Sequence, residues 1–194
     1  MTRKFDEIAE LMLSRCTRLR DSGKHEDALV CLVNLTKNMP DMPLGWFFLG
    51  QTLAAMEKYS EAIDAFDKAI ALDETDWVSI SARGFVKLRN NDINGAKSDF
   101  ARSLSIYPKD VSTLILDCIC NIITGDTPSA AQRIKQAIKF NPELTAKLYS
   151  SFMKAFAERS DVSKEDKEKL EKANKNLLKS FNELKSAQEK SSKK

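Results

Sequence analysis

Few residues of the sequence could do chemistry. The chain has one histidine, His25. Without a second histidine it lacks the favoured pair of imidazoles for a metal cluster or a histidine-based catalytic site. His25 also lies where a turn is expected, so we interpret it as an exposed turn residue. The six glycines are scattered and form no phosphate-cradling loop.

The cysteines give little further indication of chemistry. The chain has four, Cys16, Cys31, Cys118 and Cys120. They lie inside apolar helical patterns, so we interpret them as small core residues in a reducing compartment and not as a disulfide framework. Two of them, Cys118 and Cys120, are two residues apart and therefore point to different sides of a helix. Zinc and thiol chemistry are both disfavoured. We expect no enzyme activity, no cofactor, no metal and no small-molecule substrate.

Charge narrows the classes of partner. The 194 residues carry 31 Lys plus Arg and 28 Asp plus Glu, a formal net charge of +3. Residues 1–157 hold 20 basic and 20 acidic side chains, whereas residues 158–194 hold 11 and 8. A body of zero net charge argues against nucleic-acid binding, which depends on clustered Lys and Arg. A Lys-rich tail acting on nucleic acid or a membrane surface is the least favoured reading.

The sequence shows no membrane segment. No stretch approaches the roughly 20 apolar residues of a span, and the first ten residues, MTRKFDEIAE, contain acids where a signal peptide has an apolar core. We therefore expect a cytoplasmic protein.

The elements that would position any functional residue are internal repeats. Rows of 34 residues starting at Ala9, Pro43, Trp77 and Val111 bring similar residues into the same positions. Position 20 is Ala in every row, position 8 is small, position 24 is large and apolar, and position 32 is mostly Pro. In row order these residues are Ala28, Ala62, Ala96 and Ala130; Cys16, Gly50, Gly84 and Cys118; Leu32, Phe66, Phe100 and Ile134; Pro40, Glu74, Pro108 and Pro142.

Each row reads as two short helices joined by a turn. Position 15 carries the turn signal, with Gly23, Glu57, Asn91 and Gly125 in successive rows. We expect the small residue at position 8 to face the small residue at position 20, so that the two helices approach closely.

These positions resemble the tetratricopeptide repeat. The second row carries the resemblance best, with Trp46, Leu49, Gly50, Tyr59, Ala62, Phe66 and Ala69 in place. The other rows depart from the pattern at position 7, where they hold Arg15, Arg83 and Asp117. The resemblance implies an all-α protein, a right-handed superhelix (α-solenoid) of four helix pairs with a capping helix and a charged C-terminal helix.

The expected organisation follows from this frame. Residues 1–142 hold the four repeats, in frame at 9–42, 43–76, 77–110 and 111–144. Residues 143–158 form a capping helix, residues 162–188 a charged C-terminal helix, and residues 189–194 are disordered. The capping helix is expected to pack through one stripe, Leu144, Leu148, Phe152, Ala155 and Phe156. The sparse apolar face of the C-terminal helix is Leu170, Leu177, Phe181 and Leu184.

Charges at position 7 need partners, because an unpaired charge between helices is costly. Arg83 and Asp117 are 34 residues apart and occupy equivalent sites of adjacent rows. We expect them to pair with each other. Ligand binding by these charges is the alternative.

The resemblance also implies a concave, ligand-binding surface lined by the first helices of the repeats. Carried onto this sequence, its lining is unusually apolar. A surface of this kind must be covered or used. The residues expected to contact a partner are Leu44, Phe47, Gln51, Val78, Phe85, Leu88, Ile115 and Ile119. In the fourth row the alternative is simple packing of the isoleucines against the capping helix.

Related proteins that hold the acidic tails of heat-shock chaperones use Lys, Arg and Asn on this surface. The corresponding residues here are Leu13, Thr17, Phe48, Val78 and Ala82, so that clamp is absent. The expected function is a non-enzymatic adaptor that binds an apolar or helical segment of a partner protein. The alternative is a secretion chaperone that holds an apolar segment of a translocator. The protein's own C-terminal helix or a second copy of the chain are the other candidate occupants.

Overall fold

The computed structural model describes residues 2–158 and, beyond them, residues 164, 167, 168, 171, 172, 175 and 179. Residues 2–157 form nine helices, and the described residues contain no strand. No helix among them is long and apolar enough to cross a membrane. The expected C-terminal helix over 162–188 and the expected disorder of 189–194 lie outside the continuously described residues.

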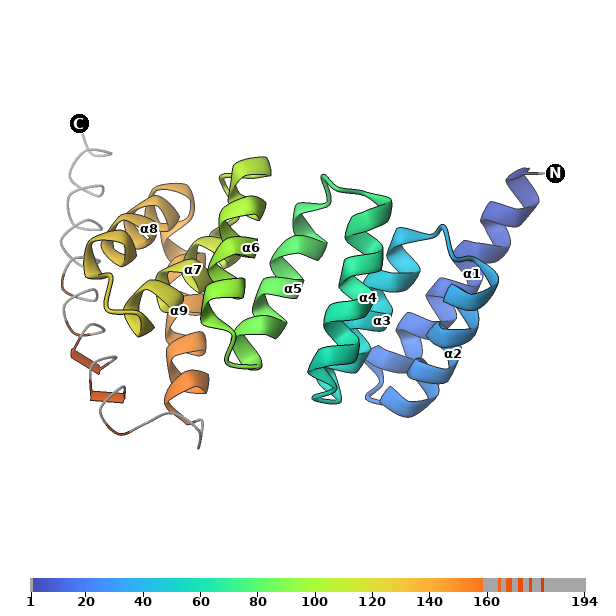
Figure 1. Cartoon of the computed structure of the whole chain (residues 1–194), viewed down its shortest axis with the longest axis horizontal. Helices are drawn as coiled ribbons and strands as arrows, with labels where there is room; N and C mark the ends of the chain where they lie inside the picture. Colours follow the sequence, from blue (N-terminus) through green and yellow to red (C-terminus); the bar gives the residue numbers. More distant parts are fainter. Residues whose placement is uncertain are drawn as a thin grey trace. The chain divides into compact units, whose positions relative to one another are not determined.

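The chain divides into two compact units, Met1–Ile106 and Tyr107–Lys194. Figure 1 labels the helices of both units. Unit 1 holds six helices: α1 (Thr2–Asp21), α2 (His25–Asn38), α3 (Pro43–Ala55), α4 (Tyr59–Leu72), α5 (Trp77–Arg89) and α6 (Ile93–Ile106). Unit 2 holds α7 (Val111–Ile123), α8 (Thr127–Phe140) and α9 (Pro142–Ala157).

Unit 1 has two layers of helices. Every helix packs against the next one along the chain. The alternate helices α1, α3 and α5 also contact one another in sequence, whereas α2, α4 and α6 do not. The layer of α1, α3 and α5 is therefore the inner, concave side of unit 1, and we call it the inner layer.

Each turn within a helix pair has the same backbone conformation. Position 15 is in the left-handed region in all four rows, with φ of 77° at Gly23, 60° at Glu57, 64° at Asn91 and 79° at Gly125. Glycine enters this region without steric cost, and asparagine enters it more readily than most other residues. The turn predicted at this position is confirmed.

Position 8 is expected from the sequence to face position 20. In the second and third rows, the side chain closest to position 8 is the large residue at position 24. A Cβ added to Gly50 would lie 2.9 Å from the ring of Phe66, and one added to Gly84 would lie 2.8 Å from the ring of Phe100. Glycine is required here because the ring occupies the space of a Cβ.

The first and fourth rows show the same constraint with other residues. Their position 24 is aliphatic, Leu32 or Ile134, and their position 8 is Cys16 or Cys118 in place of glycine. A smaller residue on the second helix is thus matched by a larger one on the first. Conserving the combined volume keeps a core well packed.

Two of the cysteines form a disulfide, which corrects the expectation that all four are free. Cys16 of α1 and Cys31 of α2 are bonded, with their Cα atoms 5.4 Å apart. Positions 8 and 23 face each other across the helix pair, which spacing along either helix alone does not reveal. Cys118 and Cys120 are free and buried, as expected.

Unit 2 is built around α7, which is buried along almost its whole length and packs on both α8 and α9. Burial raises the pKa of the Cys118 thiol to about 12, and the nearby Asp117 adds to the effect. Burial also raises the pKa of Tyr149 on α9, and its hydroxyl lacks a hydrogen-bond partner among the described residues.

The contact face of α9 differs from the predicted stripe. Thr145, Tyr149 and Met153 are buried, at spacings of four residues. Of the predicted stripe, Leu148 and Phe152 are half-buried, while Leu144 and Ala155 are exposed. The error is a rotation of about one residue, or roughly 100°. The pattern concealed it because a threonine and a tyrosine supply most of the buried face.

The ring-on-glycine contact predicts a specific coupling. Gly50→Ala should lower the free energy of unfolding of unit 1 by about 1–2 kcal/mol, because overpacking outweighs the helix propensity gained. Phe66→Leu should also destabilise. The double variant should be less destabilised than the sum by about 1 kcal/mol. Urea unfolding followed by tryptophan fluorescence measures this.

Gly45→Ala is the control, because its added Cβ would meet the Thr36 methyl at 3.3 Å and no ring. Its effect should add to that of Phe66→Leu. Additivity of Gly50→Ala and Phe66→Leu would contradict the contact.

A thiol count tests the cysteines. The native chain should react with a disulfide reagent at no cysteine at pH 8.5, because the Cys118 thiol with its raised pKa stays protonated and Cys120 is buried. Unfolding without reductant should expose two thiols, and unfolding with reductant all four. Four thiols in the unreduced, unfolded chain would show that the Cys16–Cys31 bond is absent.

Candidate functional site

The inner layer of unit 1 carries the most exposed of the predicted contact residues. Leu44 at the start of α3 is 51% exposed, and Val78 at the start of α5 is 40% exposed. Phe47, Gln51 and Phe85 are half-buried on the same two helices. Five of the eight predicted residues are thus at least partly exposed on α3 and α5 of the inner layer, and we call these five residues the concave surface.

The other three predicted residues are not accessible. Leu88 is buried in unit 1, and Ile115 and Ile119 are buried in α7. In the fourth row the alternative of simple packing is the one that agrees with this burial, since α7 packs on two helices at once. These three residues are core residues and are removed from the candidate site.

Aromatic rings form the floor of the concave surface. The ring of Phe47 contacts those of Phe48 and Phe66 edge-on, at centroid distances of 5.2 and 5.9 Å. Such edge-to-face contacts add to the stabilisation from buried area. Phe47 is thus held in place by the same ring that packs against Gly50.

Arg20 closes one end of this floor, through contacts that the sequence did not predict. Its guanidinium stacks on Phe48 at 4.7 Å, donates to Gln51 Oε1 at 2.6 Å and pairs with Asp21 at 2.7 Å. Gln51 is therefore engaged by the protein itself. No residue spacing pointed to this contact, since 31 residues separate Arg20 from Gln51.

A second guanidinium lies beyond the C-terminal end of α3. Arg89 of α5 donates to the Tyr59 hydroxyl at 2.8 Å and pairs with Glu57 at 3.2 Å, with its carbon 5.5 Å from the Tyr59 ring centre. Arginines from α1 and α5 thus bind around the end of α3. Arg20 joins α1 to α3, and Arg89 joins α5 to the turn after α3 and to α4.

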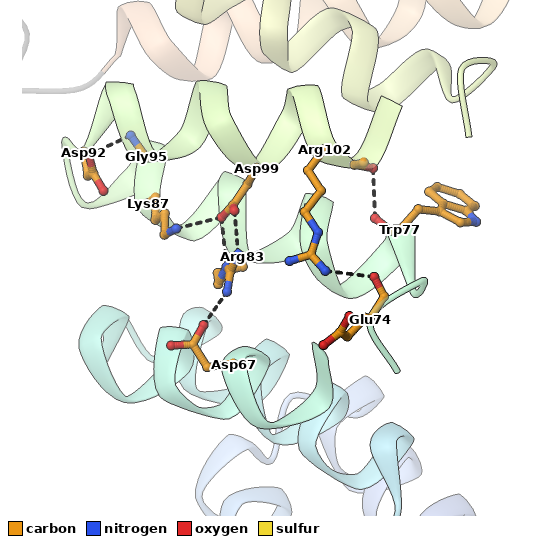
Figure 2. A network of polar contacts seen from close by, with 10 residues as sticks. Asp67, Glu74, Trp77, Arg83, Lys87, Asp92, Gly95, Asp99 and Arg102 are labelled. Carbon is orange, nitrogen blue, oxygen red and sulfur yellow. Dashed lines mark hydrogen bonds and ion pairs between the residues drawn. The ribbon is translucent and has the colours of Figure 1, made fainter. Parts of the chain in front are cut away.

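A polar network fixes α5 between α4 and α6 (Figure 2). Arg83 donates to Asp99 of α6 at 2.6 and 2.9 Å and to Asp67 of α4 at 2.5 Å. Lys87 reaches the same Asp99 carboxylate at 2.9 Å. The hydrogen bonds to Asp99 raise the pKa of Arg83. Asp99 is only 5% exposed, and the cations of Arg83 and Lys87 neutralise its carboxylate inside the protein.

The expected pairing of Arg83 with Asp117 is wrong. Arg83 pairs within unit 1, and Asp117 pairs with Arg133 of α8 at 2.6 Å within unit 2. Both pairs join positions 7 and 23 of one row, with the charges reversed between the third and fourth rows. The two charges thus pair across their own helix pairs, and Arg83 also reaches Asp67 of the preceding row.

No group of three or more potential metal ligands occurs among the described residues. The buried carboxylates Asp99 and Asp117 are each held by a guanidinium. What the concave surface offers is shape and apolar area.

Comparisons with known proteins agree with this architecture. Residues 43–76 match the family model for the tetratricopeptide repeat. A curated relative, the BBSome complex member BBS4 of Xenopus tropicalis, is 28% identical over 134 residues, covering 66% of this chain but 24% of BBS4. The chain therefore spans about a quarter of that relative's length.

Two solved structures share the fold. MamA of Desulfovibrio magneticus RS-1 is 18% identical, with a TM-score of 0.66 over 88% of this chain and 93% of MamA. YrrB, a TPR protein with an unusual peptide-binding site, is 15% identical, with a TM-score of 0.61 over 90% of each chain. At these identities the likeness concerns the fold alone.

The reversed ion pairs predict unequal tolerance to a charge swap. Arg83→Asp/Asp99→Arg should lower the free energy of unfolding of unit 1 by about 3 kcal/mol, because Asp67 and Lys87 then face like charges. Asp117→Arg/Arg133→Asp should cost less, since no further ion pair fixes its polarity within the described residues. Urea unfolding followed by circular dichroism measures both. Equal costs would contradict the role of Asp67 and Lys87.

Proposed function

The chain contains a tetratricopeptide repeat and has the fold of tetratricopeptide-repeat proteins. From this premise we propose that it is a non-enzymatic protein-interaction adaptor. The concave surface of unit 1 binds an apolar or helical segment of a partner protein. Leu44, Phe47, Val78 and Phe85 supply the contacts.

The observation that carries the proposal is the exposure of large apolar side chains on the inner layer. Leu44 and Val78 begin neighbouring helices and remain about half exposed above a floor of aromatic rings. Apolar side chains gathered on the concave side of a fold favour a protein-binding role. The peptide-binding site of YrrB supports the same class of function.

The concave surface is also preorganised. Phe47 is held by two rings and Gln51 by Arg20, so these side chains have little freedom left to lose on binding. Preorganisation strengthens binding by lowering its entropic cost. The surface therefore suits a partner of defined shape.

The chemistry of the partner follows from the lining. Leu13 is buried, Val78 is apolar, and the hydroxyl of Thr17 donates to the Ser14 carbonyl within α1. Arg20 is already paired with Asp21. The surface thus has apolar anchors in place of free cations, which favours an apolar segment over an acidic chain terminus.

A selection experiment tests the proposal. Random 16-residue peptides displayed on phage are selected on the full chain, and the selected peptides are measured by fluorescence anisotropy. We expect peptides rich in Leu, Ile and Phe. Val78→Asp should weaken them by about tenfold or more, since it places a charge in the contact.

Leu72→Asp is the matched control, because Leu72 on α4 is 41% exposed, close to the value for Val78, but lies outside the inner layer. It should leave affinity unchanged. Acid-rich peptides whose binding falls steeply with salt, or binding that survives Val78→Asp, would contradict the proposal.

A further inference from the structure

A second apolar surface lies on the first helix pair, on the side away from α3. Leu11 of α1 is 68% exposed and Val30 of α2 is 63% exposed. A groove runs between these helices. We call this surface the N-terminal face, and its residues are Leu11, Met12, Arg15, Leu19, Val30 and Asn34.

The N-terminal face is the side of a helix pair on which a preceding helix normally packs. Positions 3, 7 and 26 of the first row hold Leu11, Arg15 and Asn34. The same positions of the third row hold Ser79, Arg83 and Arg102. Across the boundary between α4 and α5, Arg83 pairs with Asp67, and Arg102 donates to the Glu74 carbonyl at 2.9 Å (Figure 2). Ser79 is fully buried there.

The second row repeats this geometry at position 3. A Cβ added to Gly45 would meet Thr36 and Leu35 of α2 at 3.3 and 3.7 Å. Position 3 therefore packs directly on the preceding helix in the second row, and it is buried in the third. In the first row the same position is Leu11, which is mostly exposed.

The positive charge on the N-terminal face has no acidic partner among the described residues. Arg15, the counterpart of Arg83, has no ion-pair or hydrogen-bond partner among them. Arg18 beside it bonds only to Ser14. Asp27 on α2 also lines the groove but pairs with neither arginine. An acidic group at the place of Asp67 would complete the contact that Arg83 makes in the third row.

We propose that the N-terminal face binds an acidic amphipathic helix of a partner protein, packed on α1 as α4 packs on α5. A carboxylate of that helix pairs with Arg15. On the partner helix, small side chains one turn away from this carboxylate make room for Leu11, and apolar side chains cover Val30.

The chemistry of the occupant follows from charge complementarity. Arg15 and Arg18 lie together on the N-terminal face, and an acidic helix of a partner protein supplies the carboxylate that Asp67 supplies to Arg83. A second copy stacked end to end is disfavoured by charge, since the exposed side chains of α8 and α9 include Lys135, Lys139 and Lys147.

The probe for the test is derived from α4 itself. It is a peptide of residues 58–73 with Ile70→Ala. Ile70 is the counterpart in the second row of Thr36, the residue that packs against position 3 of the next row. Replacing Ile70 with alanine leaves space for the larger Leu11 at position 3. A hydrocarbon bridge between positions 61 and 65, more than 100° around the helix from Asp67, keeps the peptide helical. Circular dichroism establishes its helicity before use.

Binding of this probe to the full chain is measured by fluorescence anisotropy, and the contacted amides are mapped by NMR. We expect shifts in α1 and α2. Arg15→Glu should weaken binding by about tenfold or more, and a probe with Asp67→Lys should restore it. Val78→Asp is the control and should have no effect.

Three outcomes would overturn the proposal. The helical probe does not bind, or it binds equally well to Arg15→Glu, or its binding is lost in Val78→Asp and therefore uses the concave surface. Self-association of the chain that Arg15→Glu abolishes would also overturn it, because the occupant would then be a second copy. None of these results bears on peptides selected on the concave surface.

Discussion

A phenyl ring packed against a glycine sets the geometry of unit 1. Phe66 on Gly50 and Phe100 on Gly84 leave no space for a Cβ, so these contacts between α3 and α4, and between α5 and α6, require glycine. In the first and fourth rows an aliphatic residue and a cysteine share the same volume. This contact holds Phe47 edge-on to Phe66, so the packing between layers also shapes the concave surface.

Polar contacts then order the helix pairs along unit 1. Arg83 joins α4, α5 and α6 through two carboxylates, while Arg20 and Arg89 bind around the end of α3. Buried ion pairs add little net stability but make wrong arrangements costly, because any slip leaves a charge unpaired. Arg15 occupies the same position of its row but is exposed and has no such partner in the described part of the chain, which is why we place an acidic group of the partner protein there.

The sequence was sufficient for the period, the turns and the class of fold. The turns could be predicted because the left-handed conformation limits the residue types allowed at position 15, and all four rows have this conformation. The pairing of positions was harder to predict. Spacing along one helix says which residues share a face, but not what that face meets. The ring against Gly50, the carboxylates that pair with Arg83 and the disulfide of Cys16 were therefore not predicted. Five of the eight residues expected to contact a partner stay at least partly exposed on α3 and α5, whereas the contact between Arg20 and Gln51 carried no sequence signal.

We expect unit 1 to behave as one rigid body whose concave surface exists before any partner binds. Native-state hydrogen exchange of the full chain tests it most directly, read at the buried residues Leu53 of α3 and Val86 of α5. Their opening free energies should equal the free energy of unfolding of unit 1 measured with urea and tryptophan fluorescence, since Trp46 and Trp77 both lie in this unit. Opening of α5 at a free energy several kcal/mol lower would show that the surface forms and dissolves locally, which would contradict the account.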